Sequence, residues 1–147
     1  MGALDRSRVS LRFFGDDLDP AEVTALLGVE PTASSRKGQV EKRSRGGDHT
    51  PRRGSWRLHA TNRSPGDLDG QIGELLGQVT DDLAVWRDLT RRFRADLFCG
   101  LFLRDGNEGE SLRPETLLAM GTRGLQLDFD IYAPDDSDCI SRVAPRL

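Results

Sequence analysis

Hydrophobic and polar residues alternate in three segments of the chain, at residues 9–14 (VSLRFF), 55–60 (SWRLHA) and 125–132 (LQLDFDIY). An alternation with a period of two residues predicts β-strands that have one buried face. A fourth segment, residues 95–104 (ADLFCGLFLR), is apolar on both faces, which predicts a strand covered on two sides. The chain therefore has four predicted strands, and we expect the fourth segment in the middle of a sheet.

Between the first two strands, the residues predict a short helix over 20–27. Asp19 is a favourable N-cap residue, and Pro20 suits the first helical position. Glu22 stands at the third helical position and would complete a capping box. Gly28 suits a left-handed position at the end of the helix. Local chemistry therefore defines both ends of this helix.

Two further regions have the spacing of amphipathic helices. Residues 67–93 have apolar residues at intervals of three and four, and a cap at Thr80 or Asp81 would divide this region into two helices. Residues 112–120 form a shorter helical pattern, which we expect to end at Gly121.

The order strand, helix, strand thus occurs twice, which is the plan of a ferredoxin-like fold. We expect an α+β domain whose two βαβ halves form a four-stranded, mainly antiparallel sheet. The helices of residues 67–93 would be an insertion between the halves and would cover a second face of the sheet, so that Phe98 and Phe102 are buried. The first strands of the halves, 9–14 and 95–104, would be central, and the last strand would lie beside the first. A single α/β layer with another strand order is the alternative.

The same patterns divide the chain into one domain and two tails. We expect an N-terminal tail at residues 1–8, a single domain at 9–133 and a polar C-terminal tail at 134–147. Within the domain, residues 29–54 lack periodicity and contain prolines and glycines, which predicts one long loop.

Four segments together are similar to a known bacterial family. They are FFGDDLDPAEVTALLGVEPT, Arg36-Lys37-Gly38, Gly54-Ser55-Trp56 and LDFDIY near the end. On these motifs the chain resembles the DUF4279 family, a small bacterial domain of unknown function, over about residues 9–132. The resemblance implies a single compact cytoplasmic domain, and it implies no activity, cofactor or catalytic residue.

Composition and charge add only exclusions, which concern the partners and the location of the protein. The chain of 147 residues has a net charge of −3, so the molecule as a whole has no field that attracts nucleic acid or a membrane. The first ten residues, MGALDRSRVS, lack the apolar region of a signal peptide. No segment reaches the roughly 18 apolar residues that a membrane span needs. We therefore expect a cytoplasmic protein.

The first candidate site is a polar face on the last predicted strand. Asp128 and Asp130 point to the same side, about 7 Å apart. Two carboxylates at this distance are a candidate site for a divalent cation, with Asp16, Asp17 or Asp19 as further ligands. The simpler interpretation is the solvated outer face of an edge strand, whose charges prevent edge pairing.

A cross-strand ion pair is a further expectation for this face. Because the last strand is expected beside the first, Arg12 would lie opposite Asp128 or Asp130. The residues of the candidate polar face are Arg12, Gln126, Asp128, Asp130 and Tyr132.

The second candidate site is the basic part of the long loop. From Arg36 to Arg57 there are eight basic residues and two acidic ones. The candidate residues for binding an anion or a partner are Arg36, Lys37, Lys42, Arg43, Arg45, Arg52 and Arg53. Loops that bind nucleic acid combine charge with stacking aromatics, but Trp56, the one aromatic nearby, is turned toward the core. We therefore do not expect nucleic acid as a partner, and a solvated loop without a ligand is the simplest interpretation.

Cysteine and histidine provide no catalytic site. Cys99 lies within the apolar strand, so we expect a buried thiol rather than a nucleophile. His49 and His59 have no partner at metal-binding spacing, and we expect ordinary polar side chains.

Together these observations favour a non-catalytic binding or protein-interaction module without a cofactor. Its partner would be a protein or an anionic ligand. The alternative is a divalent-metal-dependent enzyme that uses the strand face of Asp128 and Asp130. The edges of an open sheet, or helix packing, would also allow a homodimer.

Overall fold

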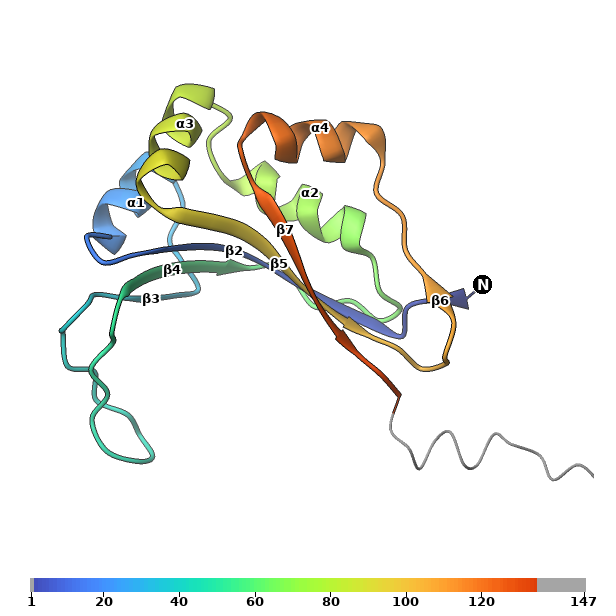
Figure 1. The fold of residues 1–147 in the computed structure, drawn as a ribbon, viewed down its shortest axis with the longest axis horizontal. Helices are drawn as coiled ribbons and strands as arrows, with labels where there is room; N and C mark the ends of the chain where they lie inside the picture. The colour runs from blue at the N-terminus through green and yellow to red at the C-terminus, as the bar shows by residue number, and fades with distance from the viewer. Residues whose placement is uncertain (1, 135–147) are drawn as a thin grey trace, which may run out of the picture.

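A five-stranded mixed sheet is the framework of the protein (Figure 1). The computed structural model describes residues 2–134. The strands of this sheet follow the spatial order β3-β4-β2-β5-β7. They are β2 (Arg6–Gly15), β3 (Ala33–Ser35), β4 (Gly54–His59), β5 (Arg94–Phe102) and β7 (Gln126–Tyr132). The short strands β1 (Gly2–Ala3) and β6 (Glu108–Gly109) form a separate parallel pair.

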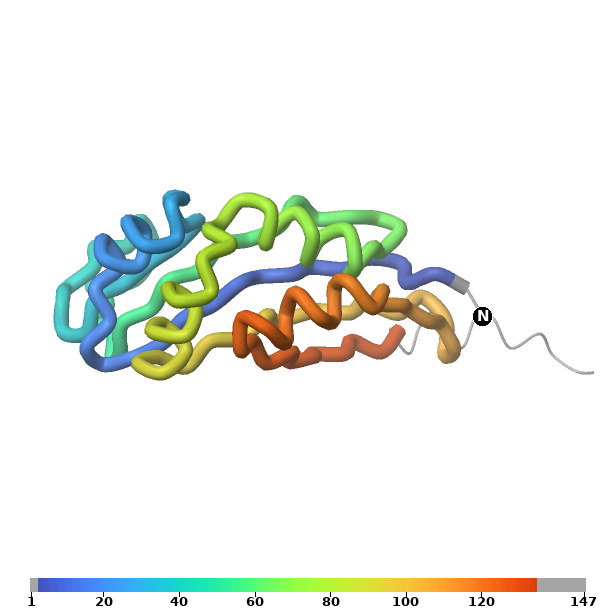
Figure 2. Tube along the Cα trace, turned by 90° about the horizontal axis from the view of Figure 1, so that it is seen from above, coloured from blue at the N-terminus to red at the C-terminus, as the bar shows by residue number. Residues whose placement is uncertain are grey.

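The helices of residues 2–134 all lie on one face of this sheet (Figures 1 and 2). They are α1 (Pro20–Leu27), α2 (Leu68–Gln78), α3 (Leu83–Arg92) and α4 (Pro114–Thr122). The predicted α+β class is confirmed. In chain order, α2 and α3 fall between β4 and β5, where the helical insertion was expected.

The two strands predicted to be central, β2 and β5, are neighbours in the middle of the sheet. They pair antiparallel from Arg6 opposite Phe102 to Phe14 opposite Arg94. On the other side of β2, β4 pairs antiparallel, and on the other side of β5, β7 pairs parallel.

The ferredoxin-like strand order is not confirmed. The sheet has five strands with one parallel pair, where four mainly antiparallel strands were expected, and β7 lies beside β5 rather than beside β2. The place beside β2 is taken by β4, which runs back along β2 with Gly54 opposite Gly15. β7 follows β5 through α4, and a connection through a helix is what allows two consecutive strands to pair in parallel.

The hydrophobic core fills the space between the helices and the sheet. Its largest side chains, Phe13, Trp56 and Trp86, are fully buried. The rings of Phe13 and Trp56 meet edge to face with centroids 5.8 Å apart, and the Trp86 ring lies 6.0 Å from Phe13. Trp56 and Phe13 therefore face the core, as the alternation of their strands predicts.

The first residues of the chain contribute to the fold. β2 begins at Arg6 rather than at Val9, and Leu4 and Ser7 are buried. The Ser7 hydroxyl donates a 2.5 Å hydrogen bond to the side chain of buried Gln71 in α2. The part of the expected tail that the structure describes is therefore tied to the core, whereas the expected C-terminal tail beyond residue 134 lies outside the described residues.

Helix α1 has the ends that its sequence predicts. The Asp19 side chain accepts a hydrogen bond from the Ala21 amide, and Gly28 has a left-handed φ of 81°. Glu22 differs from the expectation, because its carboxylate forms an ion pair with Arg92 of α3.

Two other boundaries differ from the prediction. α4 begins at Pro114 and continues through Gly121 to Thr122, so Gly121 is not its stop. The left-handed residue is Gly124, with a φ of 72°, which turns the chain into β7. The long loop also contains β3, whose three residues pair with β4.

The second face of the sheet carries no helix among the described residues, contrary to our expectation. Phe98 and Phe102 point to this face and are only partly buried. Phe129 and Ile131 lie on the helical side of β7, the apolar face that the alternation of this strand predicts to be buried, yet they are 51% and 61% exposed. β7 is an edge strand, so a neighbouring strand shields it on one side only. No helix of the described chain is both long enough and apolar enough to span a membrane.

Candidate ligand-binding face

The helix-free side of the sheet, which we call the open face, displays a mixture of arginines and aromatic rings. Alternate residues of a strand point to the same side, so each strand contributes a regular set of side chains. The open face consists of Arg6, Arg8, Ser10, Arg12 and Phe14 from β2, Arg57 and His59 from β4, Arg94, Asp96, Phe98, Gly100 and Phe102 from β5, and Gln126, Asp128, Asp130 and Tyr132 from β7.

At one end of this face, arginines surround Phe14. The guanidinium of Arg53 lies 4.1 Å from the ring centroid, and those of Arg12 and Arg57 lie at 5.0 and 5.5 Å. These distances are within the range of cation–π attraction. The Phe14 ring is only 5% exposed. Arginine side chains thus shield the ring where a helix is absent.

At the other end, the same arrangement surrounds Phe102. The Arg6 guanidinium lies 4.0 Å from the ring centroid and that of Arg8 at 5.6 Å. The Tyr132 ring stacks on Phe102 with a centroid distance of 4.6 Å and an angle of 5°. Tyr132 is 46% exposed, so one part of this aromatic pair faces solvent.

Arg12 lies between these two ends of the open face and forms a bidentate ion pair with Asp96. Its Nε and a terminal nitrogen donate hydrogen bonds of 2.8 and 2.7 Å to the two carboxylate oxygens. Asp96 is fully buried, and the hydrogen bond to Asp96 raises the pKa of Arg12. The expected pairing of Arg12 with Asp128 or Asp130 is wrong, because β5 lies between β2 and β7.

Asp128 lies beside this ion pair on the neighbouring strand. Its carboxylate accepts a 2.7 Å hydrogen bond from Gln126 and lies 3.8 Å from Arg94. Hydrogen bonding with Asp96 and Gln126, together with the charges of Arg94 and Arg12, lowers the pKa of Asp128. The structure therefore brings Arg12, Gln126 and Asp128 together around Asp96, a residue that sequence patterns did not single out.

The other two predicted residues of this face bind each other. The Tyr132 hydroxyl donates a 2.6 Å hydrogen bond to Asp130, which raises the pKa of Tyr132. Within residues 2–134, no group of three or more His, Cys, Asp or Glu side chains is arranged to hold a metal ion. The expected helpers Asp16 and Asp19 instead form ion pairs with Lys37 and Arg36.

A groove of about 370 Å³ lies in the open face. The rings of Phe98, Phe102 and Tyr132 line it together with Gly100, whose missing side chain leaves space above the centre of the sheet. The polar lining comes from Arg8, Ser10, His59 and Asn62.

His59 is held at the rim of this groove in its neutral form. Its Nδ1 lies 2.7 Å from the Ser10 hydroxyl. Partial burial, and next the charge of Arg57, lower the pKa of His59. At neutral pH the groove rim therefore offers an uncharged imidazole beside a hydroxyl.

The candidate residues of the basic loop do not come together in the one site that their sequence suggests. It extends beyond the ends of β3 and β4, away from the helices (Figure 1). Of its candidate residues, Arg53 joins the open face at Phe14. Lys42, Arg43, Arg45 and Arg52 are exposed on the loop.

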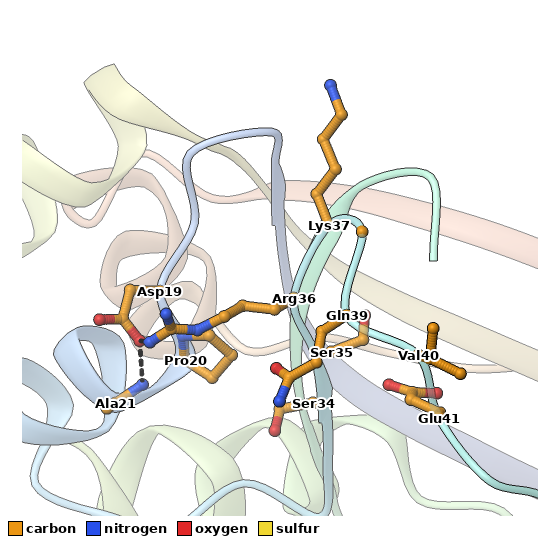
Figure 3. A pocket seen from close by; sticks show the side chains of 11 residues that line it. Asp19, Pro20, Ala21, Ser34, Ser35, Arg36, Lys37, Gln39, Val40 and Glu41 are labelled. Atoms are coloured by element: carbon orange, nitrogen blue, oxygen red, sulfur yellow. Dashed lines mark hydrogen bonds and ion pairs between the residues drawn. The ribbon is translucent and has the colours of Figure 1, made fainter. Parts of the chain in front are cut away.

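Arg36 and Lys37 line a separate hollow of about 740 Å³ beside α1 (Figure 3). Arg36 reaches toward the carboxylate of Asp19, with which it forms an ion pair, and Lys37 pairs with Asp16 at 3.1 Å. The positive groups around this hollow therefore already have negative partners. The Asp19 side chain also accepts a hydrogen bond from the Ala21 amide of α1.

Cys99 is buried, as predicted, on the helical side of β5. Burial, with smaller contributions from Asp96 and Asp128, raises the pKa of its thiol to about 12. The thiol is therefore protonated at neutral pH, which rules out a reactive nucleophile.

Comparison with known proteins identifies a family and no activity. A family model described as "Domain of unknown function (DUF4279)" matches residues 5–134. No curated protein and no solved structure gives a significant match.

Proposed function

Because the chain belongs to the DUF4279 family, whose function is unknown, we propose its function from its geometry: it is a non-catalytic binding module that takes an anionic ligand or an acidic partner on the open face. The main support is a set of arginines held over aromatic rings on a sheet face that no described helix covers.

The charges of the open face favour an anion. Arg6, Arg8, Arg53 and Arg57 form no ion pair with any other described residue. The carboxylates of the face are Asp96, Asp128 and Asp130, and the first of these is neutralised by Arg12. A protein with a net charge of −3 thus has a cationic surface on one side.

The contacts of the arginines also favour binding. A guanidinium stacked on a ring keeps its N–H donors free at its edge. Such a group binds carboxylate or phosphate with two parallel hydrogen bonds. The side chains are already ordered by the rings, so less conformational entropy is lost on binding.

Heparin affinity chromatography at neutral pH tests this proposal. We expect the protein to be retained despite its negative net charge, and to elute earlier after Arg6→Ala/Arg8→Ala or Arg53→Ala/Arg57→Ala. The matched control is Arg43→Ala/Arg45→Ala, which removes the same charge from the loop, away from the open face. Equal losses in all three variants would contradict the proposal, because they would show a dependence on net charge alone.

The alternative, a divalent-metal-dependent enzyme at Asp128 and Asp130, has less support from the geometry. The Tyr132 hydroxyl binds one carboxylate and the Gln126 amide binds the other. We therefore predict that millimolar Mg²⁺ or Mn²⁺ leaves the thermal unfolding midpoint unchanged. A rise in the wild type that is absent from Asp128→Asn/Asp130→Asn would favour the enzyme instead.

A further inference from the structure

We infer that the open face binds single-stranded nucleic acid, with one base in the groove and the phosphates along the arginines. This inference rests on the proposed function, because it names the chemical class of the anionic ligand. It depends on the groove, on the hydrogen-bonding groups at its rim and on the spacing of the arginines.

The groove has the walls that a nucleobase needs. Phe98, Phe102 and Tyr132 supply aromatic surface, and stacking on such rings holds bases of any sequence. The volume of about 370 Å³ lies within the range of small-molecule sites. Gly100 lies among these rings in a central strand, where a glycine weakens the strand and often marks the close approach of a ligand.

The rim of the groove carries hydrogen-bonding groups suited to the edge of a base. The Asn62 side chain is exposed and makes no hydrogen bond with other described residues. Its amide offers donors and an acceptor. The Ser10 hydroxyl and neutral His59 lie on the same rim. Neutral donors and acceptors of this kind bind the exposed edges of unpaired bases.

The arginines lie on both sides of the groove along β2. Arg6 and Arg8 lie at the Phe102 end, and Arg53 and Arg57 lie at the Phe14 end. The eight residue steps of β2 from Arg6 to Phe14 span about 26 Å at roughly 3.3 Å per residue. This length suits a short single strand of about four nucleotides, the lower end of the range that a single-strand-binding OB fold covers.

Single strands fit this face better than a duplex or an acidic peptide. The bases of a duplex are stacked inside the helix and cannot enter the groove. A glutamate-rich peptide would satisfy the arginines but has no ring to fill the aromatic groove. The net charge of −3 and the lack of stacking aromatics at the basic loop predict no nucleic acid, but neither feature describes the open face, whose rings come from β5 and β7.

Fluorescence anisotropy with a labelled twelve-nucleotide oligothymidylate tests the inference. The comparison ligands are an abasic strand of the same length, a twelve-base-pair duplex and a twelve-residue polyglutamate peptide. We expect the oligothymidylate to bind roughly fivefold to 150-fold more tightly than the abasic strand, which is the range that stacking of one base contributes. Affinity for both strands should fall as salt is raised.

Two sets of variants measure the contributions of the base and of the phosphates to binding separately. Gly100→Val fills the groove, and a β carbon at this position would meet its nearest neighbour, Phe102, at an ordinary 3.5 Å. Together with Tyr132→Leu, it should remove the preference for bases and leave the affinity for the abasic strand. Arg6→Ala/Arg8→Ala should lower the affinity for both the oligothymidylate and the abasic strand, whereas Arg43→Ala/Arg45→Ala should lower neither affinity. Circular dichroism confirms that each variant is folded.

The outcomes distinguish failure of this inference from failure of the proposed function on which it rests. Equal affinity for the oligothymidylate, the abasic strand and polyglutamate would overturn the inference, and retention on heparin would still support the anion-binding module. Absence of binding to every polyanion, heparin included, would overturn both. A dimer in light scattering that Arg53→Ala/Arg57→Ala dissociates would assign the open face to a second copy of the chain and also overturn the inference.

Discussion

At the residue scale, the Arg12–Asp96 pair organises the centre of the open face. Asp96 is fully buried, whereas the Arg12 side chain is 22% exposed, so only one partner keeps contact with water. The same guanidinium lies 4.2 Å from the Phe98 ring. A buried carboxylate is stable only when a partner neutralises it, so Arg12 has both an electrostatic role and a packing role.

Replacing Asp96 should destabilise the protein more than any other acidic substitution on this face. Asp96→Ala leaves the Arg12 guanidinium without its bidentate partner, and we expect a loss of roughly 2–4 kcal/mol in the free energy of unfolding. Urea denaturation measures this loss. The control is Asp130→Ala, whose carboxylate binds only an exposed hydroxyl and should change stability by less than about 1 kcal/mol. Equal effects of the two substitutions would contradict the role of Asp96.

Cys99 should be unreactive in the folded protein. Its pKa of about 12 leaves almost no thiolate between pH 7 and 9, and the side chain is fully buried. In a Cys139→Ser variant, which removes the other cysteine, a thiol reagent such as Ellman's should react only after denaturation. Rapid reaction of the native protein, increasing with pH near 8, would show that burial does not raise this pKa.

At the element scale, two glycines allow close packing around the turn before α1: Gly54 lets the start of β4 approach this turn, and Gly15 leaves room for the Phe93 ring. A β carbon at Gly54 would lie 2.7 Å from the Leu18 carbonyl oxygen and 2.8 Å from that of Gly15. At Gly15 it would lie 2.6 Å from the Phe93 ring. The close approach of backbone to backbone, rather than an unusual φ, therefore explains the glycine in the Gly-Ser-Trp motif.

Two identical substitutions in different elements should have opposite effects. Gly54→Ala introduces a clash with backbone atoms, and we expect a destabilisation of roughly 1–3 kcal/mol. Gly73→Ala lies in α2 with no neighbour within 4 Å, and should stabilise the helix by about 0.5–1 kcal/mol. Thermal and urea unfolding measure both effects. A neutral Gly54→Ala would mean that the turn moves away from β4 without penalty.

At the scale of the whole molecule, the proposed ligand site and the hydrophobic core lie on opposite faces of one sheet. The helices lie on one face and bury it (Figure 1). The arginines and rings of the other face form the proposed ligand site. The basic loop extends from the end of this sheet and contributes only Arg53 to the open face. The loop should therefore be dispensable for the integrity of the fold.

Limited trypsin digestion tests this independence. Among residues 2–134, we expect the first cleavage after Lys42, Arg43 or Arg45, which are exposed on the loop. The two fragments should stay associated, because β2 of the first fragment pairs with both β4 and β5 of the second. Mass spectrometry locates the cut, and gel filtration with circular dichroism follows the nicked protein. Unfolding on the first cut would show that the loop is structurally required.

The sequence by itself determined the features that depend on neighbours along the chain. Helix α1 has its N-cap at Asp19 and its left-handed end at Gly28, as local hydrogen bonding dictates. The alternation in β2 correctly separates Phe13 in the core from Phe14 on the open face. The apolar run around Cys99 correctly predicts a central strand next to β2. Local conformation follows from periodicity and caps, which a single segment contains in full.

Only the tertiary structure decided which strands pair at the edges and which face the helices cover. The partner of Arg12 depends on whether β5 or β7 lies beside β2, and no local pattern encodes that choice. Because the helices of residues 2–134 lie on one side, Phe98 and Phe102 on the other side pack against arginines and Tyr132 instead. A strand's alternation defines two faces but does not identify what packs on either one, because that depends on contacts between distant segments.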